Sequence, residues 1–127
     1  MSKVMVVDDA QADVVMMESI LRTAGHHVIS YNDGDRLEEN LVTELPDVLL
    51  LDVVMPKRNG YELLRRVKKD ERTRHTPVVL VTCRNGDSDR LWGKRQGADD
   101  YVTKPFTSAE LLSAVTRVTA VGRPPST

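Results

Sequence analysis

Three short, continuously apolar runs constrain the fold of this chain more than any other feature. They are Val4–Val7, Val48–Leu51 and Val78–Val81. None of them alternates apolar with polar residues, which is typical of strands buried on both faces of a parallel sheet. Two weaker strand candidates are His27–Tyr31 and Asp100–Thr103. The sequence therefore predicts a sheet of parallel strands covered on both sides.

The segments between these runs carry helical patterns. Five helices are predicted. The first has apolar positions Val14, Met17, Leu21 and Ala24 and a stop at Gly25, and the second lies around Leu37 and Leu41 and ends before Pro46. The third follows an N-cap at Asn59, the fourth runs from Asp87 to Gln96 and is stopped by Gly97, and the fifth begins at the capping-box pair Thr107 and Glu110 and continues through Leu111, Leu112 and Val115 to Val118. The strand–helix unit is thus repeated five times. We expect an α/β layered domain with right-handed crossovers.

The length of 127 residues fits one ordinary domain and is too short for two. We assign residues 1–121 to that domain. Residues 122–127 have no apolar pattern and are predicted to be a disordered C-terminal tail.

Charge and composition exclude several classes of protein. A net charge of −1 gives no bulk electrostatic argument for binding nucleic acid or an anionic membrane. The apolar runs are too short for a signal-peptide core or a membrane span. Cys83 is the single cysteine, so an internal disulfide is impossible and a reducing compartment is favoured. We therefore expect a cytoplasmic protein.

The chemistry is concentrated where the predicted strands end. The first apolar run is followed by Asp8 and Asp9, the run at 48–51 by Asp52, and the run at 78–81 by Thr82. The last strand candidate leads into Lys104. Because the C-terminal ends of parallel strands lie on one edge, where open α/β sheets bind ligands, these groups are expected to converge in one pocket.

Three crowded carboxylates repel one another unless a cation lies among them. Oxygen-only ligands favour Mg²⁺ or a similar hard ion, which keeps room for phosphate oxygens. An aspartate can attack phosphorus and form an acyl phosphate. Mg²⁺, Lys104 and the hydroxyl of Thr82 would neutralise the phosphoryl oxygens during such a transfer.

Taken together, these elements resemble the receiver domains of response regulators in two-component systems, the CheY-like family. The matching residues are the acidic pair Asp8-Asp9, the stretch from Asp52 to Pro56 with Gly60, Thr82 after its apolar strand, and Lys104-Pro105-Phe106. The match covers Lys3 to Val118. The resemblance implies a flavodoxin-like sandwich with a five-stranded parallel sheet in the order 2-1-3-4-5.

The resemblance also implies roles for individual residues. Asp52 is expected to be the phosphoacceptor of a histidine kinase. Asp9, Asp52 and the backbone carbonyl of Val54 would bind Mg²⁺ directly, and Asp8 mostly through water. Thr82 and Lys104 would contact the phosphoryl oxygens. Tyr101 matches the switch aromatic that moves inward as Thr82 turns, and the Lys104-Pro105 bond is often cis in the family.

A closer resemblance lies in Leu91–Tyr101, which is similar to the stand-alone, PilH-like receivers of twitching-motility and phototaxis systems. It implies a role in chemotaxis-like or type IV pilus motility control. Trp92 in this stretch is interpreted either as a packing residue or as an exposed anchor for a partner.

Three positions beside the predicted site are of interest. Cys83 stands where the family usually has a smaller residue, and it is interpreted as a small buried filler. Val54 and Arg84 match variable positions that tune phosphate lifetime in the family.

We compare three functions. In the first, phosphorylation of Asp52 switches a protein-binding face built from the fourth helix, fifth strand and fifth helix, and the partner is a motor component or a kinase using the domain as a phosphate sink. In the second, the chain is a phosphatase of the haloacid-dehalogenase type, but Val54 replaces the second acid of its D-x-D pattern. In the third, it is a degenerate receiver that binds partners without phosphate. We expect the first, a signalling domain and not an enzyme.

Overall fold

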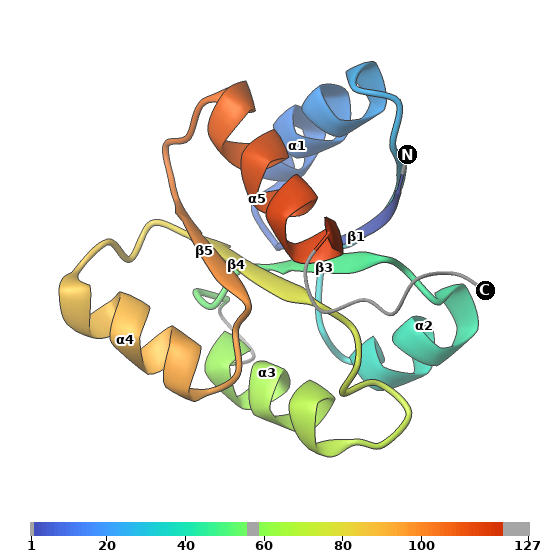
Figure 1. Ribbon diagram of the computed structural model, residues 1–127, viewed down its shortest axis with the longest axis vertical. Coiled ribbons are helices and arrows are strands. Elements are labelled where there is room, and N and C mark those ends of the chain that lie inside the picture. The colour runs from blue at the N-terminus through green and yellow to red at the C-terminus, as the bar shows by residue number, and fades with distance from the viewer. Residues whose placement is uncertain (1, 56–58, 121–127) are drawn as a thin grey trace.

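The computed structural model describes residues 2–55 and 59–120. Five strands and five helices alternate along it (Figure 1): β1 (Lys3–Val7), α1 (Gln11–Thr23), β2 (His27–Tyr31), α2 (Leu37–Glu44), β3 (Val48–Leu51), α3 (Gly60–Lys69), β4 (Val78–Thr82), α4 (Asp87–Arg95), β5 (Asp100–Thr103) and α5 (Ser108–Ala120). All five predicted strands are present, the two weaker candidates included. The predicted α/β class is confirmed.

The five strands form one parallel sheet in the order β2-β1-β3-β4-β5. This confirms the order that the family resemblance implied. The strand order reverses between β1 and β3, where Val7 pairs with Leu51. Because the two strands end in register, the residues that follow them leave the sheet side by side, and the amide of Asp52 donates to the carbonyl of Val7 at 3.1 Å.

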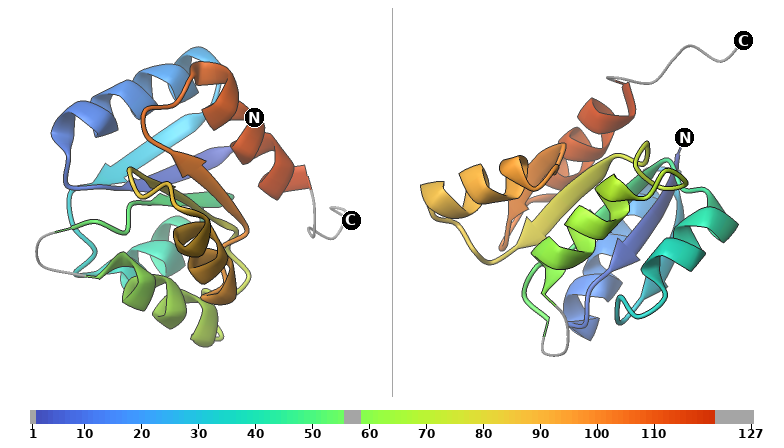
Figure 2. Two further views of the ribbon diagram at one scale, coloured as in Figure 1. Left: turned by 90° about the vertical axis from the view of Figure 1, so that its left-hand side faces the viewer. Right: turned by 90° about the horizontal axis from the view of Figure 1, so that it is seen from below.

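Helices cover both faces of the sheet (Figures 1 and 2). Helices α1 and α5 lie on one face, and α2, α3 and α4 on the other. Side chains alternate between the two cores along each strand: Val4 and Val6 pack toward α1 and α5, whereas Met5 and Val7 pack toward α2 and α3. The three strands with continuous apolar runs, β1, β3 and β4, are buried on both faces, which explains why their residues do not alternate with polar ones.

Polar caps begin two helices at the predicted places. The side chain of Asn59 accepts from the amide of Tyr61 at 2.9 Å and so caps α3. Thr107 and Glu110 form the predicted capping box at α5, because the amide of each residue donates to the side chain of the other, at 2.9 and 3.1 Å.

Two glycines end helices through left-handed backbone conformations. Gly25, with φ of 93°, follows α1, and Gly97, with φ of 111°, follows α4. The prediction extended both helices slightly too far. Helix α1 ends at Thr23 and leaves Ala24 exposed, so Ala24 is not the core position that its spacing suggested. Helix α4 ends at Arg95, one residue before the predicted end.

Some expectations concern parts of the chain outside the described residues. Pro56 of the family motif and the tail at 122–127 are among them, so the domain boundary and the disorder of the tail stay predictions. Within the described residues, none of the helices has the length and apolar character needed to cross a membrane.

Candidate functional site

Three carboxylates come together at the carboxyl edge of the sheet. One oxygen atom each from Asp8, Asp9 and Asp52 can be chosen so that all three lie within 4.8 Å of one another. Asp8 and Asp52 are buried, with 1% and 5% of their surface exposed, whereas Asp9 is exposed. Asp8 and Asp9 follow β1, and Asp52 follows the adjacent β3. The three carboxylates expected at the strand ends therefore lie together.

Lys104 extends from the end of β5 into this acidic group. Its ammonium nitrogen, Nζ, lies 2.8 Å from Asp8 Oδ2 and 3.0 Å from Asp52 Oδ2. Its backbone amide donates to the carbonyl of Thr82 at 2.8 Å, which fixes the start of the side chain against β4. The Lys104-Pro105 peptide bond is cis, as the family resemblance implied.

A fourth carboxylate, which the sequence analysis did not identify, also contacts Lys104. Asp13 Oδ2 lies 2.8 Å from Nζ. Asp13 belongs to the first turn of α1 and follows no strand. No signal in the sequence indicated this contact, because helical spacing does not show which strand end a helical side chain approaches.

In each of the two buried carboxylates, one oxygen accepts from a backbone amide and the other accepts from Lys104. Oδ1 of Asp8 accepts from the amide of Ala10, and Oδ1 of Asp52 accepts from the amide of Val54, both at 2.9 Å. Oδ2 of each accepts from Lys104. These contacts hold both carboxylates in fixed orientations, whereas the exposed Asp9 faces solvent.

Burial and the ion pairs shift two pKa values in this group. Burial raises the pKa of Asp8 above 3.8, and the hydrogen bonds from Lys104 and the Ala10 amide only partly offset it. Burial alone would lower the pKa of Lys104. Its hydrogen bonds to Asp13, Asp8 and Asp52 outweigh that effect, and its pKa lies above the ordinary value of 10.5. Lys104 is therefore a permanent cation in the pocket.

Thr82 and Tyr101 meet at one residue of the β4–α4 loop. The Thr82 side chain is fully buried, and its hydroxyl oxygen accepts from the amide of Arg84 at 3.4 Å. The hydroxyl of Tyr101 donates to the carbonyl of the same Arg84 at 2.7 Å. Tyr101 is itself buried, and Arg90 from α4 lies over its ring, 5.3 Å from the centroid.

The prediction for Cys83 was wrong, because the structure places this residue on the surface. The chain leaves the sheet directly after Thr82, so the next side chain faces solvent and not a core. Arg84 is also exposed, and its guanidinium lies 3.8 Å from the carboxylate of Asp89 in α4.

Trp92 combines features of both interpretations considered for it. It is 47% exposed, and its ring makes an edge-on contact with Tyr61 of α3, with centroids 6.4 Å apart and planes at 75°.

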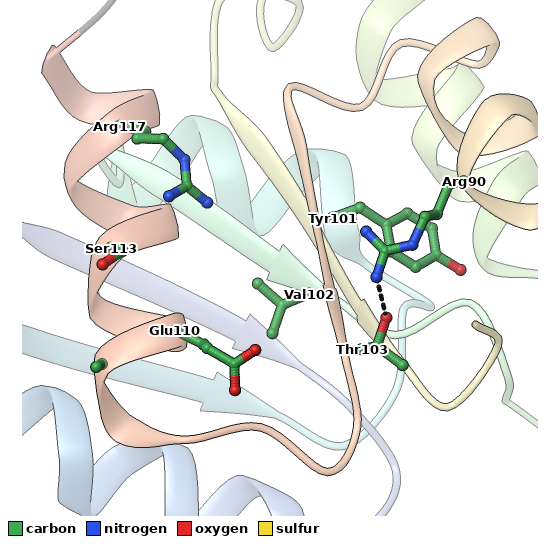
Figure 3. A pocket seen from close by; sticks show the side chains of 8 residues that line it. Arg90, Tyr101, Val102, Thr103, Glu110, Ser113 and Arg117 are labelled. Atoms are coloured by element: carbon green, nitrogen blue, oxygen red, sulfur yellow. Dashed lines mark hydrogen bonds between the residues drawn. The ribbon is translucent and has the colours of Figure 1, made fainter. Parts of the chain in front are cut away.

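A separate pocket of about 400 Å³ lies between α4, β5 and α5 (Figure 3). Its lining comprises Arg90, Tyr101, Val102, Thr103, Ala109, Glu110, Ser113 and Arg117. Arg90 donates to the Thr103 hydroxyl at 2.7 Å. Tyr101 therefore connects this surface with the β4–α4 loop beside the acidic group.

The acidic group fits a hard divalent cation. Its donors are carboxylate oxygens only, which suits Mg²⁺ better than a softer metal. Three oxygen atoms within 4.8 Å of one another allow one ion to contact several of them. Among the described residues, the one positive charge of Lys104 is in contact with three carboxylates, so a bound cation would relieve their repulsion.

Comparisons with known proteins agree on one family. The family model described as the response regulator receiver domain matches residues 4–116. The chain is 38% identical to protein PilH of Pseudomonas aeruginosa over 120 residues, which cover 94% of this chain and 99% of PilH.

Solved structures give the same result. The chemotaxis protein CheY4 of Vibrio cholerae superposes with a TM-score of 0.85 at 30% identity, over 93% of this chain and 98% of that one. The receiver domain of the sensor histidine kinase PA1611 of Pseudomonas aeruginosa was solved with a magnesium ion coordinated in its active-site cleft. It superposes with a TM-score of 0.85 at 27% identity, over 94% of this chain and 98% of that one.

Proposed function

The chain belongs to the family of response regulator receiver domains, and from this premise we propose that Asp52 accepts a phosphoryl group from the phosphohistidine of a histidine kinase. The observation that carries the proposal is the place of Asp52. Its carboxylate is buried at the end of β3, accepts from Lys104 at 3.0 Å and lies beside Asp8 and Asp9. A role in ending the strand does not account for a buried carboxylate that shares a lysine with a second buried acid.

In the proposed reaction an Asp52 oxygen forms a bond to phosphorus while the bond from phosphorus to the histidine nitrogen breaks. The electron pair of that bond leaves with the imidazole. Lys104 and the Thr82 hydroxyl then donate to the phosphoryl oxygens. Because the Lys104 ammonium is already hydrogen-bonded to Asp52 before the reaction, it need only turn to follow the incoming charge.

Mg²⁺ would be held by Asp9, Asp52 and the backbone carbonyl of Val54, with Asp8 acting mostly through water. When bound, the ion supplies positive charge to the phosphoryl oxygens. Asp9 suits direct ligation because it is exposed, whereas Asp8 is turned toward Lys104. The receiver domain of PA1611, solved with a magnesium ion coordinated in its active-site cleft, supports a magnesium site in this pocket.

We further propose that Thr82 and Tyr101 carry the signal to a protein partner on the α4–β5–α5 face. Both side chains hydrogen-bond to the backbone of Arg84. If the Thr82 hydroxyl turned toward a phosphoryl group, it would lose its contact with the Arg84 amide, while Tyr101 would still hold the Arg84 carbonyl. Tyr101 also lines the pocket of Figure 3. Similarity to PilH favours a partner in the control of pilus-based motility. We also propose that the protein acts in the cytoplasm.

A phosphatase of the haloacid-dehalogenase type is not supported. Val54, two residues after Asp52, has no acidic group to protonate a leaving alcohol. Receiver domains are signalling domains, and we propose that this one catalyses only its own phosphorylation and dephosphorylation.

The proposal is tested by intact-protein mass spectrometry after incubation with acetyl phosphate, with Mg²⁺ and with EDTA. We expect the wild type to gain one phosphoryl group only with Mg²⁺ and Asp52→Asn to gain none. Asp87→Asn, an equal change of charge at an exposed position of α4, serves as the control and should be labelled like the wild type.

Labelling of Asp52→Asn would refute the assignment of the phosphoacceptor. If the wild type takes up no phosphoryl group from acetyl phosphate or from a phosphorylated histidine kinase of a PilH-type system, the degenerate receiver becomes the better interpretation.

A further inference from the structure

Lys104 is shared by more carboxylates than the phosphorylation chemistry requires. An ammonium group has three N–H donors, and Asp8, Asp52 and Asp13 take one each, at 2.8, 3.0 and 2.8 Å. Asp8 and Asp52 belong to the acidic group at the strand ends. Asp13 lies on α1 and is not part of that group, yet its contact is as short as the shortest of the three.

The burial of the four side chains shows that Asp13 contacts Lys104 from the solvent side. The side chain of Lys104 is 13% exposed, and those of Asp8 and Asp52 are 1% and 7% exposed. The side chain of Asp13 is 33% exposed. The lysine is therefore held between two buried acids and one acid at the rim of the pocket.

A contact of this kind limits the positive charge that Lys104 presents to the pocket. The negative charge of Asp13, 2.8 Å from the ammonium nitrogen, cancels part of its attraction for any other anion. A phosphoryl group on Asp52 would be such an anion. It would approach the same nitrogen from the buried side, where Asp52 lies at 3.0 Å.

We propose that Asp13 is a positioning residue that holds Lys104 from the α1 side and weakens its interaction with the phosphoryl group on Asp52. This inference rests on the proposed function and deepens it. Asp13 does not touch the reacting atoms. It acts through Lys104 and lowers both the affinity of the pocket for a phosphoryl group and the rate at which an anionic donor reacts.

Substitutions at position 13 separate charge from hydrogen bonding. Asp13→Asn keeps an oxygen that accepts from Lys104 and removes the negative charge. Asp13→Glu keeps the charge and the acceptor. Glu18→Gln is a matched control, because Glu18 lies on the same helix and its contacts are with Arg22 and Ser30, away from the pocket.

The first measurement is the affinity for beryllofluoride, a mimic of the phosphoryl group, at a fixed Mg²⁺ concentration. Trp92, the only tryptophan, provides a fluorescence signal from α4. We expect Asp13→Asn to bind about three- to tenfold more tightly than the wild type, because one negative charge is removed near the bound anion. Asp13→Glu and Glu18→Gln should bind like the wild type.

The second measurement is the ¹H–¹⁵N NMR signal of the Lys104 ammonium in the protein without Mg²⁺, assigned through its loss in Lys104→Arg. A shift in Asp13→Asn that is absent in Glu18→Gln would show that Asp13 acts on the lysine itself. A purely structural role in α1 would leave this signal unchanged.

The outcomes separate this inference from the proposed function. Equal or weaker binding of beryllofluoride by Asp13→Asn, with normal binding by the wild type, overturns the role of Asp13 alone. A wild type that binds neither beryllofluoride nor a phosphoryl group overturns the proposed function and this inference with it.

Discussion

At the scale of single residues, the site depends on buried charge that is only partly compensated. Asp8 illustrates the balance. It is 1% exposed and hydrogen-bonded to Lys104, yet its pKa is raised because the effect of burial exceeds that of the lysine. The ionised form of Asp8 therefore destabilises the folded state. Buried carboxylates with a raised pKa are concentrated at functional sites.

We predict that Asp8→Asn stabilises the protein in EDTA at neutral pH by about 2–5 °C in Tm. The amide has no charge to bury and keeps an oxygen to accept from Ala10, but it loses the contact with Lys104. The raised pKa of Asp8 shows that burial outweighs this contact. Because the pKa of Asp8 is raised in the folded state, the wild type loses stability as pH rises from 3.8 through that raised pKa. The advantage of the variant should thus vanish in acid and reach its full size above the raised pKa.

Thermal unfolding from pH 3 to pH 8 measures this difference. An advantage of the same size at all pH values would show that ionisation of Asp8 is not its cause, and a lower Tm at neutral pH would show that the Lys104 contact outweighs burial.

Two residues show why the sequence could not reveal the whole site. Asp8, Asp9 and Asp52 were identified because each follows an apolar run, and the ends of parallel strands meet. Asp13 lies within a helix. The spacing of apolar residues in a helix does not show which strand end a polar side chain approaches. Cys83 was assigned to the core from its residue type alone, but its exposure depends on where the chain turns away after Thr82.

At the scale of elements, the close approach of α3 to the end of β3 shapes the loop that holds Asp52. Gly60 begins α3, and its amide donates to the carbonyl of Val53 at 3.2 Å. A Cβ atom at position 60 would overlap the backbone of Val53 and lie 2.6 Å from the carbonyl oxygen of Asp52. The absence of a side chain therefore permits this contact.

We predict that Gly60→Ala lowers the free energy of unfolding by about 1–3 kcal/mol, since backbone atoms on both sides must move apart. It should also slow phosphorylation, because Asp52 would be displaced. Urea denaturation and the acetyl phosphate assay measure the two effects.

Gly86→Ala is the control for this substitution, because the nearest atom to a new Cβ there is the end of the flexible Asp89 side chain, at 3.1 Å. If Gly60→Ala were as stable as Gly86→Ala, the approach of α3 to β3 would be looser than the structure shows.

Element boundaries were predictable where a side chain forms the boundary. Asn59, Thr107 and Glu110 cap their helices as expected, because the cap is a local contact between residues close in sequence. Ala24 was placed wrongly in α1 because helical spacing continued by chance beyond the point where the backbone turns at Gly25.

At the scale of the whole molecule, the parallel sheet joins two regions that are distant in sequence. Thr82 ends β4 and Tyr101 lies in β5, which are neighbouring strands. Both contact the backbone of Arg84, and Tyr101 also lines the pocket between α4, β5 and α5. The topology thus supplies a short route from the proposed phosphorylation site to the proposed partner surface. The strand order was available from the sequence only through the family resemblance.

We predict that Tyr101→Phe weakens this connection without unfolding the domain. The aromatic ring stays buried, but the 2.7 Å hydrogen bond to the Arg84 carbonyl is lost. With Mg²⁺ and beryllofluoride bound, amides at 83–86 should be protected in the wild type and exchange about fivefold faster in the variant, as expected for one hydrogen bond. Hydrogen–deuterium exchange with mass spectrometry measures the rates, and β1 should be unaffected.

Tyr31→Phe makes the same chemical change in β2 and should leave the loop unchanged. Equal protection of the loop in Tyr101→Phe and the wild type would mean that the phosphoryl signal reaches the α4–β5–α5 face by contacts that do not involve the Tyr101 hydroxyl.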